Sequence, residues 1–136
     1  MRSTKHEIRS TKQMQMTEIR NSKRYDLEDR TLAFAKNVRT FLKKVGRTPA
    51  NAEDGRQLIR STGSVGANYI EANESLSKKD FVMRIKLCRK EAKESRYWLK
   101  LMDTQADAEW EQQRKGLEEE ATELMNIFGA ILRRSE

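Results

Sequence analysis

Residues 80–102 read DFVMRIKLCRKEAKESRYWLKLM, and small or apolar side chains recur along this stretch at alternating spacings of four and three. A repeat of this kind places its members on one face of an α-helix, whereas a half-buried strand would alternate every second residue. Ser77 and Asp80 are spaced as in a capping box, so we predict that a helix of about 25 residues begins here. The positions that keep the rhythm are Phe81, Ile85, Cys88, Ala92, Ser95, Leu99 and Met102.

Three other segments carry the same apolar periodicity. The first lies at about residues 26–45 and the second at about 52–74, with Gly46 and Pro49 in the link between them. The third follows Asp107, a residue type that caps helix N-termini. Four helices with short links predict an all-α domain, an up-down-up-down antiparallel four-helix bundle over residues 26–134. Its other predicted core positions are Leu27, Phe34, Val38, Phe41, Val45, Leu58, Thr62, Val65, Tyr69, Ala72, Leu117, Ala121, Leu124, Phe128 and Ile131.

The composition narrows the classes of function. Cys88 is the single cysteine and His6 the single histidine of the 136 residues, which excludes an intrachain disulfide, a histidine metal site and a Ser/His/Asp triad. Glu71, Glu91 and Glu94 could supply acid and base groups, but no nucleophile or metal-ligand pattern accompanies them. No apolar run approaches the roughly 20 residues of a membrane span, and no signal peptide precedes the domain. We expect a cytoplasmic, non-enzymatic protein without metal or cofactor, with Cys88 as a small core thiol.

Residues 1–25 differ from the rest of the chain. They lack an apolar period, carry seven Lys/Arg against two Glu, and contain RSTK twice, at residues 2–5 and 9–12. We expect a disordered basic tail here. Because Met14 and Met16 lie just before the patterned region, the stretch is alternatively an upstream extension that the domain does not need.

Residues 61–73 read STGSVGANYIEAN and contain two glycines three residues apart. A phosphate-binding loop would need a preceding strand and, in nucleotide hydrolases, a following GK[ST] motif, and both are missing. Gly63 and Gly66 instead fall inside a helical stripe, where each costs about 1 kcal/mol relative to alanine. Because no charge occurs from Ser61 to Ile70, we expect other helices to approach this one closely. A locally frayed or kinked helix is the alternative.

A second apolar row runs along residues 80–102, on a different side of the helix from the first. It is formed by Met83, Leu87, Trp98 and Leu101. A single bundle leaves this row exposed, and large apolar side chains on a surface helix are typical of interfaces, so we predict a homo-oligomer. Glu91 and Glu94 lie in the same row, and buried carboxylates there would need polar partners. The candidate partners are Arg84, or Asn68 and Tyr69. The alternative is that both acids lie at a solvated rim of the interface. The predicted oligomer interface comprises Gly63, Gly66, Asn68, Ile70, Met83, Arg84, Leu87, Glu91, Glu94, Trp98 and Leu101.

The opposite side of the same helix is basic. Residues 78–100 carry nine Lys/Arg against three acids, whereas residues 103–136 carry four against nine, so the net charge of +7 is polarised along the chain. A basic stripe can neutralise phosphates without reading a base sequence, which predicts a site for RNA or DNA, structured RNA being the first expectation. A solvated outer face is the alternative. The predicted nucleic-acid-binding residues are Lys86, Arg89, Lys90, Lys93, Arg96, Tyr97 and Lys100.

Three motifs carry a family resemblance. They are GANYIEA at residues 66–72, SKKDF at 77–81 and KEAKESRYWL at 90–99. With the stretch around them, from about Tyr25 to Phe128, the chain resembles the 23S ribosomal RNA intervening-sequence proteins. The resemblance implies a four-helix bundle without enzymatic activity that assembles into a ring-like homopentamer.

The resemblance also bears on partners. A similar fold serves as the accessory subunit of diversity-generating retroelements, where it works with a reverse transcriptase and nucleic acid. The alternative to an RNA-binding scaffold is therefore a scaffold for a polypeptide such as a reverse transcriptase. The acidic residues of the last predicted helix could recruit a basic partner or pair with basic side chains of their own or a neighbouring chain. These acids are Glu118, Glu119, Glu120 and Glu123.

Overall fold

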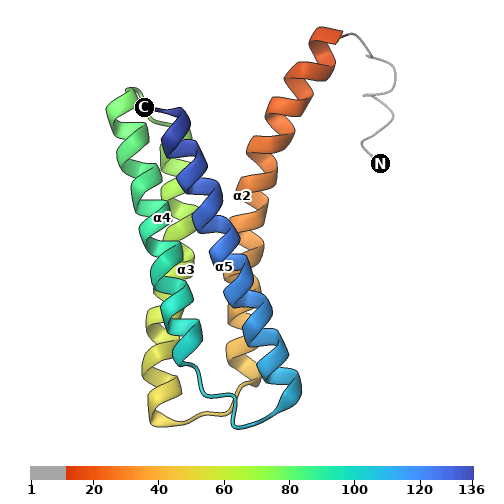
Figure 1. Cartoon of the computed structure of the whole chain (residues 1–136), viewed down its shortest axis with the longest axis vertical. Coiled ribbons are helices and arrows are strands. Elements are labelled where there is room, and N and C mark those ends of the chain that lie inside the picture. Colours follow the sequence, from red (N-terminus) through yellow and green to blue (C-terminus); the bar gives the residue numbers. More distant parts are fainter. Residues whose placement is uncertain (1–11) are drawn as a thin grey trace.

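A computed structural model of the chain describes the backbone from Lys12 to Glu136 and the side chains from Leu27 onward. The described residues form four helices, α2 (Lys12–Lys44), α3 (Pro49–Asn73), α4 (Lys78–Leu101) and α5 (Ala108–Arg134), and contain no strand (Figure 1). Successive links lie at alternate ends of the molecule, which gives the predicted up-down-up-down order. The all-α four-helix prediction is confirmed.

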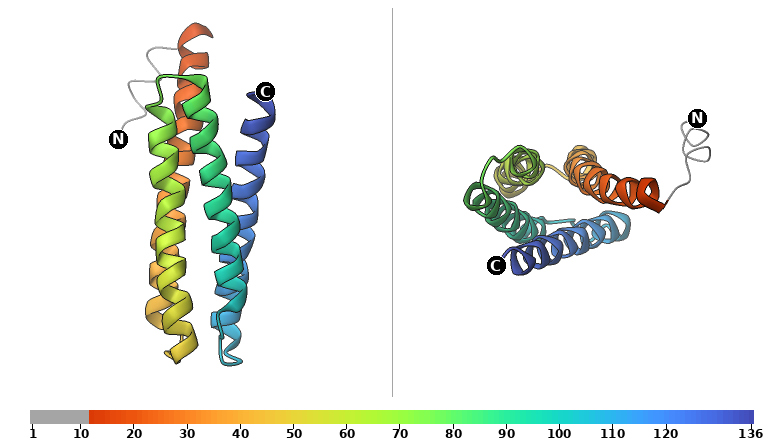
Figure 2. Two further views of the ribbon diagram at one scale, coloured as in Figure 1. Left: turned by 90° about the vertical axis from the view of Figure 1, so that its left-hand side faces the viewer. Right: turned by 90° about the horizontal axis from the view of Figure 1, so that it is seen from above.

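The four helices are arranged as a square when viewed along the bundle, and each packs against its two neighbours (Figure 2). α3 contacts α2 and α4, and α5 contacts α4 and α2. The outward side of α4 is therefore the side that faces away from both α3 and α5.

Three helix starts are explained by caps. The Thr48 side chain accepts a hydrogen bond from the Asn51 amide, and Pro49 occupies the first turn, so α3 begins slightly before the predicted residue 52. Ser77 accepts from the Asp80 amide at 3.1 Å, and Asp107 accepts from the Trp110 amide at 3.0 Å. The predicted caps at Ser77 and Asp107 are confirmed.

The first helix differs from its prediction. We predicted a start near residue 26, whereas α2 begins at Lys12. Residues 12–25 include many Lys, Gln, Met, Glu and Arg, which favour helix by propensity without forming an apolar stripe, so periodicity cannot detect them. The expectation of a disordered tail, where it concerns residues 1–11, lies outside the described residues.

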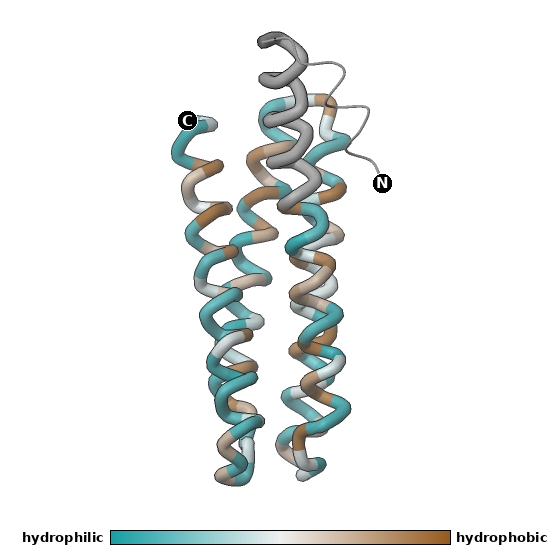
Figure 3. The backbone as a smooth tube through the Cα atoms, turned by 90° about the vertical axis from the view of Figure 1, so that its right-hand side faces the viewer, coloured by the Kyte–Doolittle hydropathy of each residue, from teal (hydrophilic) through white to brown (hydrophobic). Residues whose placement is uncertain are grey.

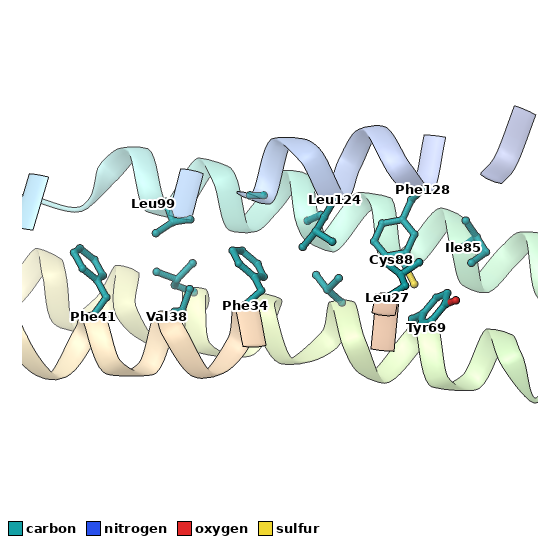
Figure 4. Packing of buried hydrophobic residues seen from close by; sticks show 14 of the residues in the cluster. Leu27, Phe34, Val38, Phe41, Tyr69, Ile85, Cys88, Leu99, Leu124 and Phe128 are labelled. Atoms are coloured by element: carbon teal, nitrogen blue, oxygen red, sulfur yellow. The ribbon is translucent and has the colours of Figure 1, made fainter. Parts of the chain in front are cut away.

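The predicted stripes meet in the core. Hydrophobic residues recur between hydrophilic ones along each helix (Figure 3), and side chains such as Phe34, Leu99, Leu124 and Phe128 point into the space that the helices enclose (Figure 4). Every predicted core position is buried except three that are half-buried: Phe81, Leu117 and Ile131. The bundle therefore fixes which sides of α4 remain available for partners.

Candidate nucleic-acid interface

The outward side of α4 carries the predicted basic stripe. Ile85, Cys88, Ala92 and Leu99 of the same helix are fully buried, so residues half a turn away point into solvent. The structure brings the predicted residues together there: Lys86, Arg89, Lys90, Lys93, Tyr97 and Lys100 are exposed, and Arg96 is half-buried.

The stripe divides into paired and unpaired cations. Lys100 Nζ lies 3.8 Å from Glu118 Oε2, and Arg96 Nη1 lies 3.5 Å from the Thr122 hydroxyl, so both reach toward α5. The remaining four cations form no ion pair with any residue whose side chain the structure describes. We call these four the basic face; they are Lys86, Arg89, Lys90 and Lys93. Their charges remain available for an anionic ligand.

Arg60 of α3 is the partner of the two acids on the side of α4. Its Nη2 lies 3.3 Å from Glu91 Oε1 and 2.5 Å from Glu94 Oε1, and Trp98 Nε1 donates to Glu94 Oε1 at 3.2 Å. Partial burial alone would raise the pKa of Glu94, but the hydrogen bonds from Trp98 and Arg60 together lower it below its usual value. These acids therefore link α4 to α3 within one chain.

The predicted partners of these acids were wrong. Arg84 Nη1 instead donates to Asn68 Oδ1 at 3.1 Å, and Asn68 donates to the Ser64 carbonyl. The Tyr69 ring is buried and lies at a tilt 6.0 Å from that of Phe128. Sequence reasoning missed Arg60, because pairing across α3 and α4 depends on the register between two helices and not on the face of one.

The glycines of α3 make their close approach within the chain. A Cβ atom added to Gly66 would lie 3.1 Å from the Thr31 hydroxyl of α2, and one added to Gly63 would lie 3.7 Å from Arg39 Nη2. Both glycines lie inside an unbroken helix, so the frayed alternative is excluded. The crowding that we predicted is thus present, and α2 supplies it.

The second apolar row of α4 is partly uncovered in the single chain. Met83 and Leu101 are exposed, and Leu87 and Trp98 are half-buried. Ile70, on α3, is also exposed. These side chains are accessible to a second copy, and the predicted oligomer interface stays a prediction.

The acids of α5 are mostly engaged inside the chain. Arg30 of α2 binds Glu120 through Nε at 2.7 Å and also reaches Glu123. Arg114 Nη1 binds Glu118 at 2.8 Å, whereas Glu119 is exposed. Glu118 and Glu120 are thus half-buried in ion pairs, whereas Glu119 and Glu123 remain exposed.

Three further observations concern the thiol, metal ligands and membrane-spanning helices among the described residues. Burial raises the pKa of the Cys88 thiol to about 12, so the thiol stays protonated at neutral pH, as expected for a core position. No cluster of three metal-ligating side chains occurs in the described part of the chain. No helix within it has the length and apolarity needed to cross a bilayer.

A comparison with known families assigns most of the chain to one of them. The family model of the 23S rRNA-intervening sequence proteins matches residues 23–130. The chain belongs to this family. The match includes all of α3 and α4 and most of α2 and α5.

A solved structure resembles this chain. It is the crystal structure, at 1.70 Å resolution, of a protein with unknown function from the S23 ribosomal protein family of Bacteroides thetaiotaomicron. The two chains share 27% sequence identity with a TM-score of 0.64, over 77% of this chain and 96% of the other. No curated protein matches the chain.

Proposed function

We propose that this protein is a non-enzymatic, oligomeric scaffold that binds nucleic acid, structured RNA in the first place, through α4. The observation that carries the proposal is the basic face, in which Lys86, Arg89, Lys90 and Lys93 are exposed without an ion pair to any described side chain. Cations of this kind gain affinity for a polyanion because they displace counterions condensed on its phosphates.

The dimensions of the basic face suit a nucleic acid strand. From Lys86 to Lys93 the helix rises about 10 Å, at 1.5 Å per residue. One strand of a duplex places a phosphate about every 3.4 Å along the axis, so the face spans about three phosphates. Flexible lysine side chains accommodate such contacts without a fixed base sequence, which fits a scaffold better than a sequence-specific reader.

Self-association extends this surface. The uncovered row of Met83, Leu87, Trp98 and Leu101 gives a second copy an apolar surface to bury, as the family resemblance to a homopentameric ring suggests. Each added copy repeats the basic face, and linked sites raise the apparent affinity for a long RNA without any new type of contact. The assembly and the basic face therefore serve the same function in a cytoplasmic setting.

A polypeptide partner such as a reverse transcriptase is the second candidate. It would use the acidic surface of α5, but Glu118, Glu120 and Glu123 already bind Arg114 or Arg30. A basic polypeptide would have to displace these arginines. The cations of the basic face have no ion pair with a described side chain, which favours a nucleic acid over a basic polypeptide as the ligand of α4.

Direct binding tests the proposal. The purified protein is titrated into a fluorescein-labelled RNA hairpin at 50, 100 and 200 mM salt, and anisotropy is followed. We expect an affinity that falls steeply with salt, because phosphate contacts release counterions. Absence of binding at 50 mM salt, or an affinity that is independent of salt, would rule out the proposed function.

A further inference from the structure

Tyr97 is the exposed aromatic side chain next to the basic face. It lies four residues after Lys93 and seven after Lys90, so the three share one side of α4. The residue is 55% exposed, and a tyrosine combines an apolar ring with a polar hydroxyl that suits it to contacts at a surface. Tyr97 takes part neither in the hydrophobic core nor in the ion pairs between helices of the described chain, so these contacts do not explain its position.

The Tyr97 ring is supported from one side. Its centroid lies 5.2 Å from that of Trp98, and the two rings meet edge to face at 70°. Because the residue is 55% exposed, part of it remains accessible to a flat partner. Aromatic rings also stack with nucleobases, and this stacking tolerates any base because every base has a π face.

The supporting ring is itself held in place. Trp98 packs against the core, and its Nε1 donates to Glu94, which is bound in turn by Arg60 of α3. A contact chain therefore runs from α3 to the exposed ring. A ring whose neighbour is fixed loses less conformational freedom when a ligand orders it, so the arrangement is preorganised for a planar ligand.

The surroundings indicate which planar ligand fits. Lys93 and Lys90 lie about one and two helical turns before Tyr97, within reach of successive phosphates on one side of a base that contacts the ring. A paired base in a duplex keeps both faces in the stack and cannot reach a tyrosine on a convex helix. An unpaired base in a single strand or loop can.

We infer that Tyr97 is a base-stacking residue and that the α4 surface therefore selects single-stranded or looped RNA over duplex RNA. This inference rests on the proposed function, since it requires the basic face to bind nucleic acid. The basic face supplies affinity for any phosphate chain, and Tyr97 adds the preference for unpaired bases.

Two variants and two probes test the inference. The probes are a fluorescein-labelled 12-nucleotide oligouridine and a 12-base-pair RNA duplex, measured at the same salt concentration. Tyr97→Leu keeps an apolar side chain but loses the π face, whereas Tyr97→Phe keeps the ring. We expect Tyr97→Leu to weaken oligouridine binding about tenfold and duplex binding less than twofold, and Tyr97→Phe to bind both probes like the wild type.

A spectroscopic readout locates the contact. Trp98 and Trp110 are the two tryptophans of the chain, so Trp110→Phe makes Trp98 the reporter. Oligouridine should change the Trp98 emission, because the ligand contacts the ring that adjoins it, and the duplex should leave the emission unchanged. Circular dichroism confirms that each variant is folded.

The outcomes separate this inference from the proposed function. If neither probe binds the wild type, the function and the inference both fail. If replacing the four cations of the basic face abolishes binding while Tyr97→Leu keeps the wild-type ratio of oligouridine to duplex affinity, only the inference fails. It fails equally if Tyr97→Leu changes the oligomer mass and leaves both affinities unchanged, since Tyr97 is then a protein contact.

Discussion

Asn51 and Asp103 are joined by two hydrogen bonds between the asparagine side chain and the aspartate backbone. Asn51 Nδ2 donates to the Asp103 carbonyl at 2.9 Å, and Asn51 Oδ1 accepts from the Asp103 amide at 2.9 Å. The same Nδ2 donates to the Gly46 carbonyl at 2.8 Å. One side chain thus fastens the α2–α3 link to the α4–α5 link, which lie at the same end of the bundle.

Replacing Asn51 by alanine should destabilise the protein. Asn51 is only 4% exposed, and its removal takes away three hydrogen bonds to backbone groups of Gly46 and Asp103. We expect the free energy of unfolding to fall by about 1–3 kcal/mol. Urea denaturation followed by circular dichroism measures the loss. Asn126→Ala, on the exposed side of α5, is the matched control, and an equal loss in both variants would show that the fastening contributes nothing.

Gly66 and Gly116 should respond oppositely to the same substitution. A Cβ on Gly66 would crowd Thr31, whereas one on Gly116 would meet nothing within 4 Å. Gly66→Leu should therefore cost about 1–3 kcal/mol through overpacking. Gly116→Leu should stabilise the chain by up to about 1 kcal/mol through helix propensity. Thermal and urea unfolding decide the matter, and a stabilised Gly66→Leu would show that α2 does not approach α3 closely.

Glu111 should contribute to the acid sensitivity of the fold. A hydrogen bond from Arg114, with a further one from Thr104, lowers the pKa of Glu111 from 4.5 to about 2, against the opposing effect of burial. A carboxyl group whose pKa is lowered by folding stabilises the folded state above its unfolded pKa, and this stabilisation is lost as the pH falls from about 4.5 through 2. Unfolding free energies measured from pH 6 to pH 2 should thus fall less steeply in Glu111→Gln. Glu109→Gln is the control, and parallel curves for Glu111→Gln and the wild type would contradict the assignment.

Self-association should depend on the second apolar row of α4. Leu101 is 45% exposed in this row, whereas Leu76, in the link before α4, is fully exposed outside it. Leu101→Asp places a charge that an apolar interface would have to bury, so it should lower the oligomer mass in light scattering, and Leu76→Asp should not. A wild-type protein that runs as a 15.9 kDa monomer at micromolar concentration would refute the assembly.

The core could be predicted from the sequence because each helix carries its own periodic signal. The spacing of apolar residues indicates which side of each helix faces the core. The residues on these sides include Val38, Leu58, Cys88 and Leu124, which are fully buried. The start of α2 could not be predicted in this way, since residues 12–25 have helix-forming composition without an apolar stripe. Periodicity reports an apolar face, and it does not detect a helix whose sequence lacks one.

The site could be predicted only as far as one helix determines it. The side of α4 that carries Lys86, Lys90 and Lys93 follows from 3.6 residues per turn alone. The pairing of Arg60 with Glu94 and of Lys100 with Glu118 depends on how far neighbouring helices are shifted along each other. A single helix contains no information about that shift, so the sequence could not separate the paired cations from the unpaired ones.

The central claim is that the basic face binds RNA phosphates, and the salt dependence of RNA affinity tests it most directly. The test variant replaces four cations of α4 by glutamine, and its control removes the same number and types of cation from exposed positions of α2. The test positions are Lys86, Arg89, Lys90 and Lys93, and the control positions are Lys36, Arg39, Lys43 and Lys44.

Both variants lose the same net charge, so only the location of the loss differs between them. In the test variant we predict weaker binding of the RNA hairpin and an unchanged oligomer mass. The slope of log affinity against log salt should be flatter by up to about 3 units, because each lost phosphate contact reduces the magnitude of this slope by about 0.7–0.9. The control should keep most of the wild-type slope. A test variant that binds RNA with wild-type affinity and slope would contradict the account.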